Sequence, residues 1–171
     1  MIKMEKLKVG IIGLGVGEKH LEAYESHPNC EIVALCDISK EIRDSLRPKY
    51  PRLQIVENAD DILHDKDINI VSIASYDNYH YEQIMKAACN EKHVFVEKPL
   101  CLYEKEAQEI RKIFSNKPHL KLSSNLILRK SPRFNALKQK IKNGSMGDIY
   151  HIEGDYNYGR LHKITCGWRG D

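Results

Sequence analysis

The chain has 171 residues, of which 42% are hydrophobic and 30% charged, and its formal net charge is +3. This composition is typical of a globular domain and offers no dense Lys/Arg block for nucleic acid. No run approaches the about 18 apolar residues that a membrane-spanning helix requires. The 5 cysteines are widely spaced, with no C-x-x-C pair, so we expect a cytoplasmic protein without a disulfide framework or a metal site.

Short apolar runs alternate with longer amphipathic segments over residues 1–124. The runs predict strands, and the segments between them predict helices. Several runs are apolar on both faces and therefore need cover on both sides of a sheet. The alternation predicts an α/β fold with a doubly wound parallel sheet. Strands are expected at Lys8–Ile12, Glu31–Cys36, Leu53–Val56, Ile68–Ser75, His93–Val96 and Leu120–Ser123, and helices at Glu18–Ser26, Ser39–Tyr50, Ala59–His64, Tyr79–Asn90 and Tyr103–Ser115.

The pattern changes after Ser124. A helix is expected at Pro132–Lys142, and the alternation over Asp148–Tyr158 predicts a strand with one face exposed or partnered. We therefore expect one domain at 1–124 and an incomplete α+β domain at 125–171. A strand without a partner leaves N–H and C=O groups unpaired, so we expect this tail to be disordered or to pair with another copy of the chain.

The turn after the first expected strand is rich in glycine. The sequence GIIGLGVGEKH places Gly13, Gly15 and Gly17 between a strand and a helix. Glycine permits a sharp turn and a close approach of phosphate, and the helix N-terminus supplies free N–H groups. The dinucleotide fingerprint is G-x-G-x-x-G, and this turn is one residue shorter. A dinucleotide site, a site for another nucleotide-type ligand and a plain turn are all compatible with it.

Asp37 ends the second expected strand. A carboxylate there accepts hydrogen bonds from a ribose hydroxyl pair and repels a 2′-phosphate, which favours NAD without excluding NADP. Asp37 is also a suitable cap for the following helix. The glycine turn and Asp37 together predict a nucleotide-type ligand. S-adenosylmethionine-dependent methyltransferases share both features, so these two features do not decide the class of enzyme.

Polar residues also follow the fourth and fifth expected strands, as ASYDNYH (74–80) and VEKPL (96–100). The ammonium group of Lys98 can hydrogen-bond a substrate hydroxyl and help to move its proton. Glu97 can anchor a ribose or orient Lys98. The Lys98–Pro99 bond is a candidate for the cis form. Taken alone, Lys98 is better explained as an ordinary solvated surface lysine.

The order of the glycine turn, Cys36-Asp37, ASYDNYH and HVFVEKPL resembles the Gfo/Idh/MocA oxidoreductase family over essentially the whole chain. The E-K-P motif is the most specific mark. The resemblance implies a Rossmann-type dinucleotide-binding domain in an NAD(P)-dependent oxidoreductase acting on a sugar, cyclitol or nucleotide-sugar hydroxyl. It also favours the interpretation of the glycine turn as a dinucleotide turn with one residue removed.

The resemblance implies roles for individual residues. Lys98 is the catalytic candidate, Tyr76 and Asp77 replace the family's usual proline and asparagine, and His80 suits either cofactor contact or packing of its loop. Trp168 and Arg169 are candidates for substrate contact. The implied cofactor contacts are Gly13, Gly15, Val16 and Gly17 for the pyrophosphate, Asp37 for the adenosine ribose, and Ser75, Asp77, His80, Glu97, Lys98 and Asn125 elsewhere.

Members of this family are much longer, and the helix that carries their main proton-transfer group has no match here. The chain is therefore interpreted as a fragment that binds a dinucleotide and turns over little substrate. A non-catalytic dinucleotide-binding module is the alternative, and a methyltransferase is a weaker one because it leaves E-K-P unexplained. The resemblance also implies a homo-oligomer formed through the sheet of the second domain.

Overall fold

A computed structural model describes residues 5–157, 159 and 165 of the chain. It divides into two compact units, Met1–Ile127 and Leu128–Asp171, and each is described by itself. Among the described residues, no helix is both long and apolar enough to cross a membrane.

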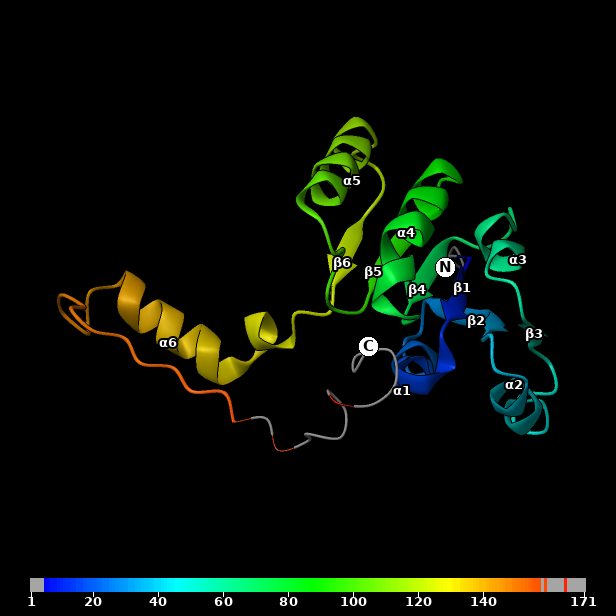
Figure 1. The fold of residues 1–171 in the computed structure, drawn as a ribbon, viewed down its shortest axis with the longest axis horizontal. Helices are drawn as coiled ribbons and strands as arrows, with labels where there is room; N and C mark the ends of the chain where they lie inside the picture. Colours follow the sequence, from blue (N-terminus) through cyan, green and yellow to red (C-terminus); the bar gives the residue numbers. More distant parts are fainter. Residues whose placement is uncertain (1–4, 158, 160–164, 166–171) are drawn as a thin grey trace. The chain divides into compact units, whose positions relative to one another are not determined.

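The first unit is built on a six-stranded sheet in the order β3-β2-β1-β4-β5-β6 (Figure 1). Every neighbouring pair of strands is parallel. The chain therefore winds outward from the centre in both directions, and the order reverses between β1 and β4. The strands are β1 (Leu7–Ile12), β2 (Cys30–Cys36), β3 (Gln54–Val56), β4 (Ile70–Ile73), β5 (His93–Val96) and β6 (Leu122–Ser124).

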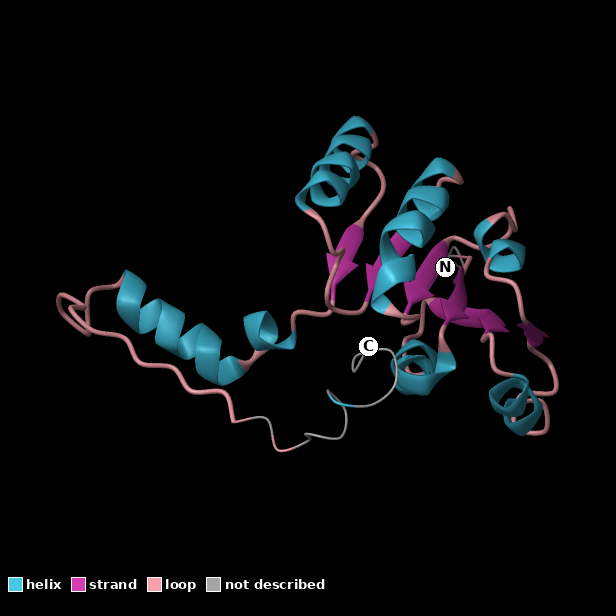
Figure 2. Ribbon diagram, in the orientation of Figure 1, coloured by secondary structure: helices cyan, strands magenta, loops and turns pink. Residues whose placement is uncertain are grey.

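Helices cover both faces of this sheet (Figure 2). One face packs against α1 (Leu14–Glu25) and α2 (Lys40–Leu46), which contribute Leu21 and Leu46 to that core. The opposite face packs against α3 (Asp60–Leu63), α4 (His80–Cys89) and α5 (Glu104–Asn116).

The strands supply side chains to both cores, as their sequences require. In β1, Val9 and Ile11 join the core beneath α1, whereas Ile12 joins the core beneath α4. Successive side chains of a strand point to opposite faces, so a run that is apolar on both faces needs helices on both. The prediction of a doubly wound α/β fold is confirmed.

Several boundaries differ from those expected. Helix α1 begins at Leu14 rather than Glu18, because the single residue Gly13 (φ 84°) turns the chain from β1 into the helix. Helix α2 ends at Leu46, well before Tyr50. Pro48 lies just beyond that end, and a proline has no N–H with which to continue the helical hydrogen bonds.

The second unit contains α6 (Pro132–Lys142), at the bounds expected and with its proline in the first turn. The strand expected at Asp148–Tyr158 is wrong over residues 148–157, where the structure has no strand. Tyr150 is 99% exposed and Ile152 is 80% exposed, so these two side chains pack on neither a strand nor a core of the described residues. Domain bounds of 1–124 and 125–171, and an oligomer formed through a second-domain sheet, stay predictions.

Candidate functional site

Most of the predicted site residues lie at one edge of the sheet. In a parallel sheet the carboxyl ends of the strands meet at the same edge, and ligands bind where the strand order reverses. That reversal lies between β1 and β4. The glycine turn follows β1, Asp37 follows β2, Ser75 follows β4, Glu97 follows β5 and Asn125 follows β6.

Gly13 makes the turn itself. Its backbone has φ 84°, and a Cβ placed there would lie 2.4 Å from the carbonyl carbon and oxygen of Ala74. Its N–H donates to the carbonyl oxygen of Cys36 at 2.8 Å. The end of β1 is thus held between its two neighbours, in a conformation and at a distance that admit only glycine.

Gly15 and Gly17 lie on opposite faces of α1. A Cβ on Gly15 would meet no heavy atom of the described chain within 4 Å, whereas one on Gly17 would lie 3.1 Å from Ile11 Cγ2 and 3.3 Å from Ala74 Cβ. Residues two apart on a helix point in nearly opposite directions. Gly17 therefore lets the helix pack on the sheet, while Gly15 and the exposed Val16 leave the helix N-terminus open to a ligand.

The carboxylate of Asp37 binds the glycine turn. Asp37 is only 8% exposed. Its Oδ2 accepts from the backbone N–H of Leu14 at 2.7 Å, and its Oδ1 accepts from the N–H of Ser39 at 2.8 Å. Ser39 itself caps α2 by accepting from the N–H of Ile42. Asp37 therefore does not cap α2; it fixes the start of α1 and the turn that follows β2.

Charged neighbours also stabilise the turn that follows β2. Arg43 is buried and donates to the carbonyl oxygens of Asp37 and Ile38, at 2.8 and 3.0 Å, and to the carboxylate of Glu57 at 2.7 Å. Burial, with a smaller contribution from the negative charge of Asp37, raises the pKa of Cys36 to about 12. The Cys36 thiol therefore stays protonated, and it donates to the carbonyl oxygen of Glu57 at 3.4 Å.

The loop after β4 is braced from inside by His80. Its ring is fully buried, with Nδ1 2.6 Å from the carbonyl oxygen of Pro99 and Nε2 3.1 Å from that of Ser75. His80 thus links the loops that follow β4 and β5, and this arrangement favours the packing role over direct contact with a ligand. The Ser75 hydroxyl donates to Gln83 Oε1 at 2.7 Å, and Asp77 begins the short helix η1 (Asp77–Tyr79).

Glu97 and Asn125, which follow β5 and β6, are in contact at the same carboxyl edge of the sheet. Glu97 Oε1 accepts from Asn125 Nδ2 at 2.6 Å and lies 3.2 Å from His20 Nε2, while Oε2 accepts from the backbone N–H of Lys98 at 3.2 Å. Burial alone would raise the pKa of Glu97, but the hydrogen bonds from Asn125 and His20 outweigh it, so the pKa is lowered. Lys98 is exposed beside this carboxylate, and the Lys98–Pro99 bond is cis, as predicted.

The structure thus joins Glu97, Lys98 and Asn125 in one cluster and ties Asp37 to the glycine turn. Trp168 and Arg169 lie outside the described residues. Sequence reasoning missed the role of His20 and its partner Ser72, which approach to 2.9 Å. A signal for this pair exists, because Ser72 places a hydroxyl between the apolar residues Val71 and Ile73 in the middle of a strand.

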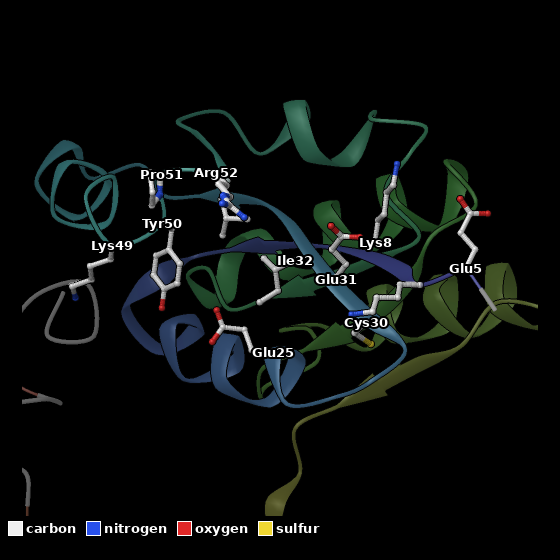
Figure 3. A pocket seen from close by; sticks show the side chains of 12 residues that line it. Glu5, Lys8, Glu25, Cys30, Glu31, Ile32, Lys49, Tyr50, Pro51 and Arg52 are labelled. Carbon is white, nitrogen blue, oxygen red and sulfur yellow. The ribbon is translucent and has the colours of Figure 1, made fainter. Parts of the chain in front are cut away.

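A pocket of about 900 Å³ lies at the opposite, amino-terminal edge of the sheet (Figure 3). Its lining includes Lys8 and Glu31, near the starts of β1 and β2, and Tyr50 in the turn before β3. It is therefore distinct from the carboxyl-edge site. Within the described part of the chain, no group of three or more His, Cys, Asp or Glu side chains could hold a metal ion.

Comparison with known proteins agrees with this geometry. Residues 7–124 match the family model described as an oxidoreductase family with an NAD-binding Rossmann fold. The chain is 26% identical to a scyllo-inositol 2-dehydrogenase (NADP(+)) of Bacillus subtilis, covering 98% of this chain and 46% of that protein. It is 25% identical to a myo-inositol 2-dehydrogenase of Thermotoga maritima, covering 82% of this chain and 42% of that protein.

A solved structure shares the fold. The crystal structure of scyllo-inositol dehydrogenase from Lactobacillus casei, with bound NAD(H) and scyllo-inositol, superposes with a TM-score of 0.77 at 26% identity and covers 85% of this chain and 43% of that one. The chain spans less than half the length of each of these relatives. Because the family match covers most of the chain and includes both the glycine turn and E-K-P, the chain belongs to the Gfo/Idh/MocA family of oxidoreductases.

Proposed function

We propose that the chain binds NAD(H) at the carboxyl edge of the sheet and forms the cofactor-binding part of a dehydrogenase. The observation that carries this proposal is the open face of Gly15, beside an ordered carboxylate at Asp37 and across the edge from Glu97 and Lys98. The residues present fit the cofactor: the helix N-terminus suits a pyrophosphate, and Asp37 suits the hydroxyls of the adenosine ribose.

The proposed substrate is a ring alcohol of the sugar or cyclitol class, as the names of the inositol dehydrogenase relatives suggest. A bound nicotinamide would exchange the hydride with the carbon of the substrate. The chain's own contribution is Lys98, which hydrogen-bonds the substrate hydroxyl and helps to move its proton. A cytoplasmic location is also proposed, and the four described cysteines, all free, support it.

Titration of the purified chain with NADH, followed by fluorescence, tests cofactor binding, with NADPH and S-adenosylmethionine as comparisons. We expect NADH to bind more tightly than NADPH, because the Asp37 carboxylate repels a 2′-phosphate. No binding of NADH by the folded chain would contradict the proposal, and binding of S-adenosylmethionine instead would favour a methyltransferase-like site. Binding of NADH without oxidation of any inositol or sugar would support a non-catalytic module.

The substitution Gly15→Ala is expected to weaken NADH binding by about tenfold or more, because the added methyl group occupies the space where a phosphate must approach the helix. The same change leaves the free protein as stable, or up to about 1 kcal/mol more stable, because alanine favours a helix over glycine. Thermal unfolding without ligand, measured beside the titration, separates the two effects. Unchanged NADH affinity in Gly15→Ala would place the pyrophosphate elsewhere.

A further inference from the structure

His20 is held on three sides beneath the cluster of Glu97 and Asn125. It lies on α1, and its buried ring has Nδ1 2.9 Å from the hydroxyl of Ser72 in β4 and Nε2 3.2 Å from Glu97 Oε1 after β5. The ring of Phe95 packs against it edge-on, with centroids 5.3 Å apart and planes at 74°. The imidazole therefore has one orientation.

The hydrogen-bond directions in this network follow from chemistry. An ionised carboxylate only accepts hydrogen bonds, so Nε2 of His20 carries the proton that Glu97 accepts. In that tautomer Nδ1 accepts from the hydroxyl of Ser72. The hydroxyl of Ser72 and the N–H of His20 thus both donate in the direction of Glu97.

This arrangement leaves Glu97 with one acceptor position for a ligand. A carboxylate oxygen accepts about two hydrogen bonds, and Oε1 already accepts from Asn125 and His20. Among the described residues, the backbone N–H of Lys98 is the one donor to Oε2. The side chain of Glu97 is 15% exposed, and Lys98 is exposed beside it. The remaining acceptor position is therefore on Oε2, the oxygen bonded to the backbone of the exposed residue Lys98.

We propose that His20 is a positioning residue, which together with Ser72 holds the Glu97 carboxylate ionised and aimed at a hydroxyl of the nicotinamide ribose. The inference rests on the proposed function, since it assigns Glu97 to that end of the dinucleotide. His20 itself is buried and does not touch the ligand. Its effect is therefore confined to the part of a ligand that reaches Glu97.

Three ligands of increasing length separate this role from a general role in stability. ADP has the adenosine ribose and two phosphates, ADP-ribose adds the second ribose, and NADH adds the nicotinamide. The full chain, His20→Leu and His20→Gln are titrated with each by calorimetry. Leucine removes both hydrogen bonds of His20, whereas glutamine keeps an N–H donor close to the position of Nε2.

We expect His20→Leu to lower the affinity for ADP-ribose and for NADH by about tenfold, because the charge-assisted hydrogen bond from Glu97 to the ligand is no longer held in place. The affinity for ADP should stay within about twofold of that of wild type. His20→Gln should recover most of that loss. Equal weakening of all three ligands by His20→Leu would show a structural role and overturn the proposal, and so would unchanged binding of all three. Wild type that binds none of them would overturn the proposed function itself, and the ligand role of His20 with it.

A second measurement is independent of any ligand. Nitrogen-15 NMR of the wild-type histidines should show His20 with its proton on Nε2. Carbon-13 NMR should show the highest pKa of Glu97 in His20→Leu, which lacks the donor, and a value closer to that of wild type in His20→Gln, which keeps one. A Glu97 pKa that is the same in all three proteins would overturn the proposal.

Discussion

The substitution Gly13→Ala is expected to unfold the first unit and to abolish NADH binding at the same time. Two effects add at this residue. An alanine is strained at φ 84°, and its Cβ would lie 2.4 Å from the carbonyl carbon and oxygen of Ala74. The backbone cannot move aside, since Ala74 donates to Ile12 at 2.7 Å and Gly13 donates to Cys36 at 2.8 Å.

The loss should be about 3–5 kcal/mol, from strain and overpacking together, which is comparable with the whole stability of a small domain. Urea unfolding followed by circular dichroism measures it. Gly15→Ala is the matched control, because it adds the same methyl group two residues further on with no atom of the described chain within 4 Å. A Gly13→Ala midpoint equal to that of Gly15→Ala would show that the turn does not approach Ala74 as described.

The sequence predicts the sheet well because the information is local. The run EIVALC is apolar at every position but the first, and only a strand covered by helices on both faces buries such a run. The residues that follow these runs then lie at one edge by the geometry of parallel strands. Asp37 and Glu97 are therefore placed at the correct edge before any coordinates are known.

The sequence does not predict features that depend on distant partners. Ser72 and His20 are 52 residues apart in the chain, and only the packing of α1 on the sheet brings their side chains together. Residues 148–157 alternate like a strand, but a strand exists only with a neighbour that completes its hydrogen bonds. The early start of α1 depends in the same way on one backbone angle at Gly13.

A further large effect is expected for Asp37→Ala, which should lower both the stability of the first unit and its selectivity between cofactors. The carboxylate accepts from the N–H groups of Leu14 and Ser39 in a corner that is almost fully buried. Leaving these donors unpaired costs about 2–4 kcal/mol in the free energy of unfolding. A simple loss of NADH binding would therefore mix a damaged turn with a missing ribose contact.

The ratio of NADH to NADPH affinity separates the damaged turn from the missing ribose contact, because the fraction of folded protein affects the binding of both ligands equally. Under the proposed function, the wild-type carboxylate would accept from the ribose hydroxyls of NADH and repel the 2′-phosphate of NADPH. Asp37→Ala removes both interactions, so the preference for NADH should fall toward one even where the variant is partly unfolded. The matched control is Asp44→Ala, whose carboxylate pairs with Lys40 on the surface at 53% exposure and should change neither stability nor the ratio. If Asp37→Ala loses stability but keeps the wild-type ratio, Asp37 only holds the turn, and the ribose must be selected by another residue of the edge.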